Sequence, residues 1–243
     1  MSMRSTGAKQ AMAGNRTGLQ TSPELAEELI EGASSATPSS DGGAEEIAEY
    51  RGEYIAEGFP IGSMPTMPAS QEGEADEEEA GMAVLLDKLS ERLAFERTGT
   101  RLYEALLNKC EMLGEMSPGP TLEDIEHIGR EELEHFLMLN RTITDIGGDP
   151  TVQSPCADMT GVASMGIMQV LTDPRSSMAQ CLQAMLTAEL TDNAGWELLI
   201  SLADNLGYDE MKTEFESARK NEEEHLMKVR SWVSECVLDS AQV

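Results

Sequence analysis

The chain has 243 residues, among them 17 Lys or Arg against 45 Asp or Glu, which gives a formal net charge of -28. So acidic a composition excludes nucleic acid and anionic membrane surfaces as partners, because both require a basic footprint. No apolar run approaches the roughly 20 residues of a membrane span, and the first residues lack the apolar stretch of a signal peptide, so we expect a cytoplasmic protein.

Residues 1–80 differ in composition from the rest of the chain. They hold four basic and 16 acidic residues, and Ser, Pro and Gly are frequent around two helix-like pieces, residues 22–32 and 43–58. The apolar content is too thin to build a core, so we interpret this segment as a flexible acidic arm with short helices. Two roles stay open. Either the arm docks on the rest of the protein or on a partner, or it is a disordered tail that keeps the chain soluble.

Residues 81–243 carry apolar side chains at the three- and four-residue spacing of amphipathic helices. The predicted helices are residues 82–113, 121–146, 173–205 and 209–237. Thr121, with an acid three residues later, resembles a capping box, and a Gly-Gly-Asp-Pro sequence stops the second helix. About 25 residues with one short apolar helix-like stretch, 162–171, connect the second helix to the third, whereas the other connections are short. The pattern predicts an all-α four-helix bundle with one long crossover.

Two of the three histidines belong to Glu-x-x-His units on alternate helices of this pattern. One unit is Glu132-Leu-Glu-His135, and the other is Glu222-Glu-Glu-His225. Residues three apart share a helix face, so each unit directs one carboxylate and one imidazole to a common point. Two such units on facing helices predict a metal site in the middle of the bundle.

The first and third helices should each supply one inward carboxylate, and Glu96 and Glu189 are the candidates. Glu96 precedes Glu132 by 36 residues and Glu189 precedes Glu222 by 33, as an internally repeated helix hairpin would place them. Apolar neighbours such as Leu133 indicate a buried setting, where carboxylates are costly unless metal ions neutralise them. The competing interpretation is a set of solvated helix faces with incidental histidines.

The stretches ERLAFERTGTRLYEALL and AELTDNAGWELL, with the repeated ligand pattern, resemble the ferritin-like superfamily of di-metal carboxylate proteins, and most closely uncharacterised bacterial ferritin-like domain proteins. The resemblance covers roughly residues 82–237. The ligands that it implies are the bridging Glu132 and Glu222, the terminal Glu96 and Glu189, and one histidine for each ion, His135 and His225. Carboxylates with imidazoles favour two Fe ions, with Mn as the alternative.

Two aromatic residues occupy corresponding places, seven positions after the first and third carboxylates. Tyr103 corresponds by resemblance to a tyrosine that bacterioferritin-like helices place close to the metals, which implies a catalytic role as hydrogen-bond or electron donor. A half-buried core tyrosine is the alternative. Trp196 is expected to pack in the core, with an electron relay as the lesser alternative.

Three polar residues near the ligands have open roles. Glu131 either orients His225 from the neighbouring helix or is solvated. Asp192, three residues after Glu189, either adds a carboxylate to the site or pairs locally. We expect His127 at the surface or the edge of the core, because eight residues before His135 is well off the ligand face.

The chain departs from known members of the superfamily in several ways. Bacterioferritins carry a haem-binding Met where this chain has Leu133, so haem is not expected. The four cysteines form no Cys-x-x-Cys pair, so the sequence does not contain the Cys-rich iron domain of rubrerythrins. We therefore expect an external electron donor. The long crossover and the acidic arm disfavour a storage cage. The family resemblance implies that the chain forms a homodimer.

The leading functional hypothesis is a di-iron oxidoreductase or ferroxidase that consumes oxygen or peroxide. A manganese catalase-like enzyme is the enzymatic alternative. A different class is a non-enzymatic bundle in which the metals hold the helices together and the arm recruits a partner. A further alternative is cargo of a larger protein shell, with residues 1–60 as the address.

Overall fold

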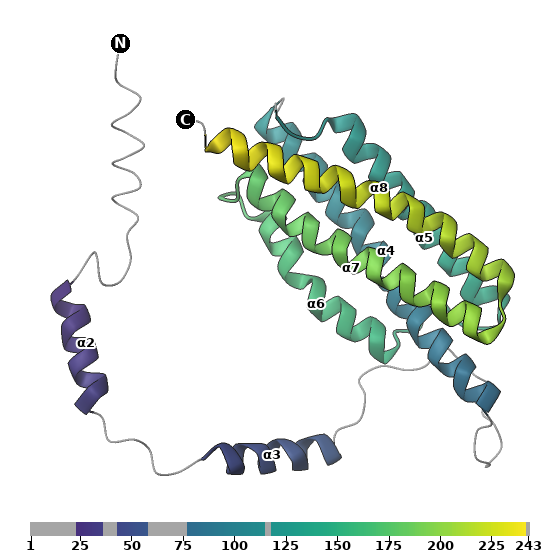
Figure 1. Cartoon of the computed structure of the whole chain (residues 1–243), viewed down its shortest axis with the longest axis horizontal. Helices are drawn as coiled ribbons and strands as arrows, with labels where there is room; N and C mark the ends of the chain where they lie inside the picture. Colours follow the sequence, from purple (N-terminus) through teal and green to yellow (C-terminus); the bar gives the residue numbers. More distant parts are fainter. Residues whose placement is uncertain (1–22, 36–42, 58–76, 115–117, 242–243) are drawn as a thin grey trace. The chain divides into compact units, whose positions relative to one another are not determined.

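The computed structural model describes residues 23–35, 43–57, 77–114 and 118–241. Within these ranges the regular structure is α-helical and contains no strand, so the prediction of an all-helical protein is confirmed for the described part of the chain (Figure 1). None of the described helices is long and apolar enough to cross a membrane.

In the N-terminal unit, the described residues form two short helices. Helix α2 spans Pro23–Ser35 and α3 spans Ala44–Glu57, close to the two helix-like pieces expected from the sequence. Ahead of α3, the backbone N–H of Gly43 donates to Glu46 Oε2 at 2.9 Å, which caps the start of that helix. The remainder of residues 1–76 lies outside the described ranges, so the flexible arm and its roles stay predictions.

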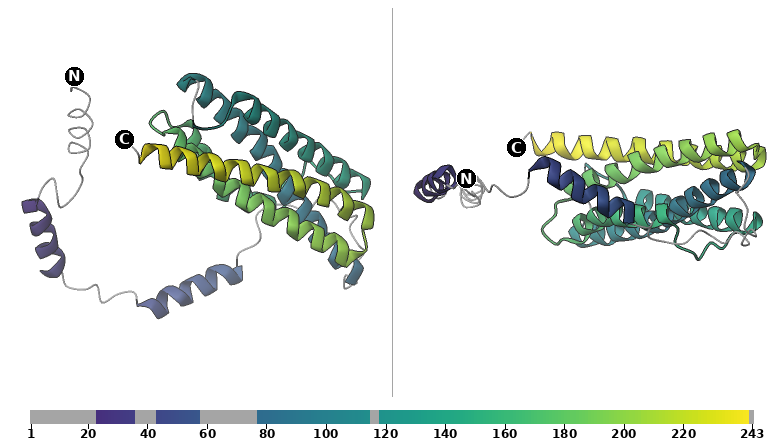
Figure 2. Two further views of the ribbon diagram at one scale, coloured as in Figure 1. Left: turned by 45° about the horizontal axis from the view of Figure 1, so that its top comes forward. Right: turned by 90° about the horizontal axis from the view of Figure 1, so that it is seen from below.

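In the second unit, the described residues form five helices that pack side by side (Figures 1 and 2). Their bounds are α4 Glu77–Leu113, α5 Leu122–Asp145, α6 Pro155–Thr172, α7 Met178–Leu206 and α8 Asp209–Ser240. The closest pairings are α7 with α8, α4 with α5, and α4 with α6. The α4–α5 pair faces the α7–α8 pair through α4 and α7, whereas α5 and α8 meet at few points. Helix α6 lies against α4 and α7.

Local capping explains where the expected helix boundaries shift. The third predicted helix begins at Met178 rather than at residue 173, because Ser177 and Gln180 form a capping box. Asp173 instead ends α6, through its backbone N–H. The short apolar stretch predicted in the crossover is part of α6, an 18-residue helix that begins after the N-cap Ser154. Gly207, with φ 79°, ends α7 in the left-handed conformation.

The core of this unit consists of two apolar clusters at different levels along the helices. One contains Leu85, Leu89, Trp196 and Phe215, and the other contains Leu102, Leu106, Leu182 and Val229, each with further buried neighbours. Along α4, α5, α7 and α8 alike, the six predicted ligands fall between members of the two clusters. A buried polar layer therefore lies between two apolar layers.

Candidate metal centre

Four helices bring the six predicted ligands into this polar layer. Glu96 comes from α4, Glu132 and His135 from α5, Glu189 from α7, and Glu222 and His225 from α8. None of the six is more than 5% exposed. The two Glu-x-x-His units behave as their spacing requires, because residues three apart on a helix share one face. The interpretation of solvated helix faces is therefore wrong.

The flanking leucines, in contrast, do not lie where we expected. Leu133 is 43% exposed and Leu190 is 47% exposed, although each directly follows a buried glutamate. Successive residues on an α-helix are rotated by about 100°, so the neighbour of an inward ligand points away from the polar layer. Their apolar character was not evidence for burial of the site.

Glu222 lies between the two histidines. Its Oε1 is 2.7 Å from Nδ1 of His135, and its Oε2 is 3.2 Å from Nδ1 of His225. Glu96 Oε2 lies 3.7 Å from His135 Nδ1, and Glu132 Oε1 lies 3.7 Å from His225 Nδ1. At its Nδ1, each histidine thus shares Glu222 and has one further carboxylate of its own. Two three-residue groups result, and within each the ligand atoms lie within 4.8 Å of one another.

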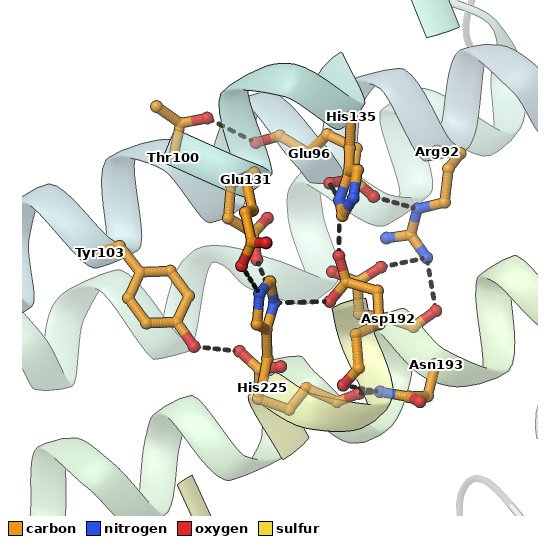
Figure 3. Close-up of polar contacts among 12 residues, drawn as sticks. Arg92, Glu96, Thr100, Tyr103, Glu131, His135, Asp192, Asn193 and His225 are labelled. Atoms are coloured by element: carbon orange, nitrogen blue, oxygen red, sulfur yellow. Dashed lines mark hydrogen bonds and ion pairs between the residues drawn. The ribbon is translucent and has the colours of Figure 1, made fainter. Parts of the chain in front are cut away.

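Glu189 belongs to the layer but not to these compact groups. Its Oε1 accepts a hydrogen bond from the hydroxyl of Tyr103, which is itself 1% exposed. Its Oε2 is buried without a hydrogen-bond partner. The structure therefore places Tyr103 against one of the predicted ligands, and Figure 3 shows its ring directed into the cluster.

A buried arginine, which sequence reasoning missed, completes the polar layer. Arg92 Nη1 is 3.1 Å from Oδ1 of Asp192 and donates to the Asp192 carbonyl, while Nε lies 3.2 Å from Glu96 Oε1. Asp192 also forms a group with Glu96, Glu132 and Glu222, whose carboxylate oxygens lie within 4.8 Å of one another. The signal in the sequence was the position of Arg92, one helical turn before Glu96 with only apolar residues between the two.

Two helical glycines make room for these side chains. A Cβ on Gly99 would overlap Oε2 of Glu132 and lie 2.9 Å from its Cδ. A Cβ on Gly195 would overlap Nη1 of Arg92 and lie 3.0 Å from its Cζ. Glycine inside a helix costs about 1 kcal/mol relative to alanine, so a close approach of this kind is a physical reason for its presence.

Residues around the ligands fix their positions. Glu131 Oε2 lies 2.8 Å from Nε2 of His225, which is one of the two roles that the sequence left open, and this contact leaves Nδ1 facing the carboxylates. His127, with a side chain 48% exposed, lies 3.4 Å from the same Glu131 oxygen. Asn193 Nδ2 donates to the backbone carbonyls of Glu189 and Glu222, which ties α7 to α8 at the level of the site.

Trp196 is fully buried and packs edge-on against His135, with ring centroids 5.6 Å apart. It also contacts Phe215. The expected packing role is therefore observed, and it places an indole directly beside one of the predicted ligands.

The protonation of the cluster reflects crowding of like charges in a buried place. Burial lowers the pKa of both histidines, but their carboxylate neighbours outweigh it and raise the pKa of His135 to about 9 and that of His225 to about 10. Burial alone would raise the pKa of Glu222, yet the two histidines hold it at about 2. Burial and the neighbouring carboxylates raise the pKa of Glu132 well above its usual range and that of Glu189 to about 8.

The donor set fits a pair of divalent cations. Five buried carboxylates, those of Glu96, Glu132, Glu189, Asp192 and Glu222, face the single guanidinium of Arg92. With neutral imidazoles, the excess of four negative charges equals the charge of two divalent ions. Several buried atoms of the set have no hydrogen-bond partner, among them Glu96 Oε2, Glu132 Oε2 and His135 Nε2. Buried polar atoms without partners are rare, and ion coordination is one explanation for them.

Comparisons with protein-family models, with curated proteins and with solved structures found no match for this chain. The functional assignment therefore depends on the residues of the site. A buried acidic and histidine cluster that could hold metal is what those residues establish.

Proposed function

We propose that this chain is a ferritin-like di-metal carboxylate protein that binds two iron ions and reduces oxygen or peroxide. In this proposal α4, α5, α7 and α8 are the four helices of the bundle and α6 belongs to the crossover. The observation that carries it is the convergence of two Glu-x-x-His units and two further glutamates, one group from each of four helices, in a buried layer.

The ligands would divide into two sets that share Glu222. His135 and Glu96 would serve one ion, and His225 with Glu132 would serve the other, as their distances to Glu222 suggest. Glu189, held by Tyr103, would complete the second set. Oxygen and imidazole donors suit iron or manganese, whereas thiolates would favour zinc or iron–sulfur clusters.

The protein's own groups would hold this set in place and tune it. The guanidinium of Arg92 restrains Glu96 and offsets part of the negative charge. Glu131 keeps His225 turned so that Nδ1 faces the centre. Burial, followed by the charge of Glu189, raises the pKa of Tyr103 well above its usual value, so the residue stays a phenol and a hydrogen-bond donor.

When bound, a pair of ferrous ions supplies two electrons, which together with two protons reduce one hydrogen peroxide to two waters. The described part of the chain carries its cysteines singly, as free thiols. We therefore expect the electrons that restore the ferrous state to come from an external donor. Tyr103, whose hydroxyl contacts Glu189, is the residue we assign to assist at the site.

Anaerobic titration of the metal-free full chain with Fe(II), followed by air or peroxide, tests the proposal. We expect about two Fe(II) bound per chain and an iron(III) absorbance after the oxidant is added. Glu132→Gln should lose most of this binding, whereas Glu126→Gln, an exposed change on the same helix, should not. Failure of the wild-type chain to bind iron, or binding without oxidation, would contradict the proposed activity.

Further measurements on the same metal-free chain separate the alternatives that the ligands leave open. Preferential loading with manganese and disproportionation of peroxide without a reductant would identify the manganese catalase-like enzyme. Metal binding that raises the melting temperature but gives no turnover with either oxidant would identify the non-enzymatic bundle.

A further inference from the structure

A cavity of about 280 Å³ lies at the seam between α5 and α8 and reaches one of the proposed ligands. Its lining includes Glu134, His135 and Arg141 from α5, and Glu214, Ala218 and Asn221 from α8. The two helices meet at few points, in contrast to the close pairing of each with its hairpin partner. The cavity therefore occupies the least tightly packed side of the helix assembly.

The walls of the cavity are one stripe of residues from each helix. Glu134 and Arg141 are seven residues apart on α5, and Glu214 and Asn221 are seven apart on α8, which is two turns of one helix face. Glu134, Arg141 and Glu214 are exposed, whereas Ala218 is buried at 3% exposure. The cavity thus runs from charged residues at the surface to a small buried side chain, one helical turn before Glu222.

His135 forms the inner end of this cavity. At 5% it is the most exposed of the six proposed ligands. Its Nδ1 faces Glu222 and Glu96, while its Nε2 is buried and has no hydrogen-bond partner. A histidine that binds metal through one nitrogen normally donates from the other, so His135 lacks a partner of the kind that Glu131 gives His225.

We propose that this cavity is the vestibule through which hydrated divalent cations enter the metal centre. The inference rests on the proposed function, because it assigns a route to that same centre. Two carboxylates against one guanidinium give the entrance a negative charge, and the acidic chain attracts cations in general. The volume equals that of about nine waters at roughly 30 Å³ each, enough for an ion with a first hydration shell.

The route implies separate roles for its residues. Glu134 and Glu214 capture the ion at the mouth, and Asn221 offers an uncharged amide within the cavity. Ala218 leaves space in the cavity, because a larger side chain there would fill part of the volume that Ala218 and His135 both line. These groups affect how fast the centre fills, and the ligands determine how tightly it holds the ions.

Stopped-flow mixing of the metal-free full chain with Co(II), followed by its visible absorption, tests the route. Glu134→Gln with Glu214→Gln should slow loading about tenfold at low ionic strength, less so at high salt, and leave the final stoichiometry unchanged. The matched control is Glu126→Gln with Glu216→Gln, two exposed changes on the same helices outside the cavity. Ala218→Leu should slow loading at every ionic strength.

The outcomes separate the route from the metal centre. If the wild-type chain takes up no Co(II), the proposed metal centre is wrong, and the proposed entry route is then wrong as well. If wild type loads but the Glu134 and Glu214 double variant loads as fast as the control, the centre stands and the route is wrong. Because that double variant alters exposed side chains only, it decides the question even if Ala218→Leu fails to fold.

Discussion

Replacing Gly99 with alanine tests the packing of the centre with the addition of one methyl group. Gly99 lies on α4, three residues after Glu96, where its missing side chain admits the carboxylate of Glu132. A Cβ at this position would overlap Glu132 Oε2 and lie 2.9 Å from Cδ. Because Glu132 is only 1% exposed, its carboxylate can yield only by moving within the crowded layer.

Two effects of opposite sign are expected from Gly99→Ala. Alanine stabilises the helix by about 1 kcal/mol relative to glycine. The displaced Glu132 carboxylate, in contrast, should weaken metal binding by about 10- to 100-fold, the usual effect of disturbing the orientation of a ligand. That loss corresponds to about 1.4 to 2.7 kcal/mol. Overpacking of a buried site costs about 1–3 kcal/mol, so metal-free stability should fall by no more than about 2 kcal/mol, while metal affinity falls clearly.

Calorimetric titration of metal-free wild type and Gly99→Ala with Co(II), together with urea unfolding of both metal-free proteins, measures the two effects. Gly166→Ala on α6 is the matched control, because nothing lies within 4 Å of a Cβ placed there. The control should gain stability and keep its affinity. Equal Co(II) affinity of Gly99→Ala and wild type would refute the placement of Glu132 among the ligands.

Three further predictions concern the buried arginine, the two histidines and a buried cysteine. Gly195→Ala should displace the buried guanidinium of Arg92 and destabilise the metal-free protein by about 1–3 kcal/mol in urea unfolding, and an unchanged midpoint would contradict that packing. Since the pKa values of His135 and His225 are about 9 and 10, both carry a proton at pH 7 that a bound metal must displace. Co(II) affinity should therefore rise from pH 7 to 10, with release of protons detected by an indicator dye. An affinity that does not change with pH would exclude these two histidines as ligands. Burial raises the pKa of the Cys110 thiol to about 11, so at pH 8 iodoacetamide should label it far more slowly in the folded protein than in urea, and labelling of the folded protein should speed up as the pH rises. Equal labelling rates in the folded and the urea-unfolded protein, measured by mass spectrometry, would show that the thiol is not buried.

The helices and the ligand faces could be predicted from the sequence because both depend on local periodicity. A Glu-x-x-His unit needs only one helix to bring its two side chains together, and the bounds of α5 and α8 follow from residues within or next to them. The start of α7 was misplaced by five residues, because Asp173 looked like a cap while Ser177 and Gln180 provide the actual capping box.

Features that depend on how helices pair could not be predicted in this way. The roles of Arg92, Gly99 and Gly195 appear only when α4 is placed against α5 and α7. The exposure of Leu133 has the same origin, since an apolar residue next to a ligand reveals nothing of which side faces the neighbouring helix. The vestibule between α5 and α8 likewise exists only because these two helices pack loosely.

Elemental analysis of the full chain, purified without chelator or added metal, tests the central claim most directly. We predict about two transition-metal ions per chain, with iron as the metal, and their loss in Glu222→Gln but not in Glu223→Gln, which changes the exposed neighbour. A metal-free wild-type chain, or equal metal content in the two variants, would contradict a di-metal centre at this site.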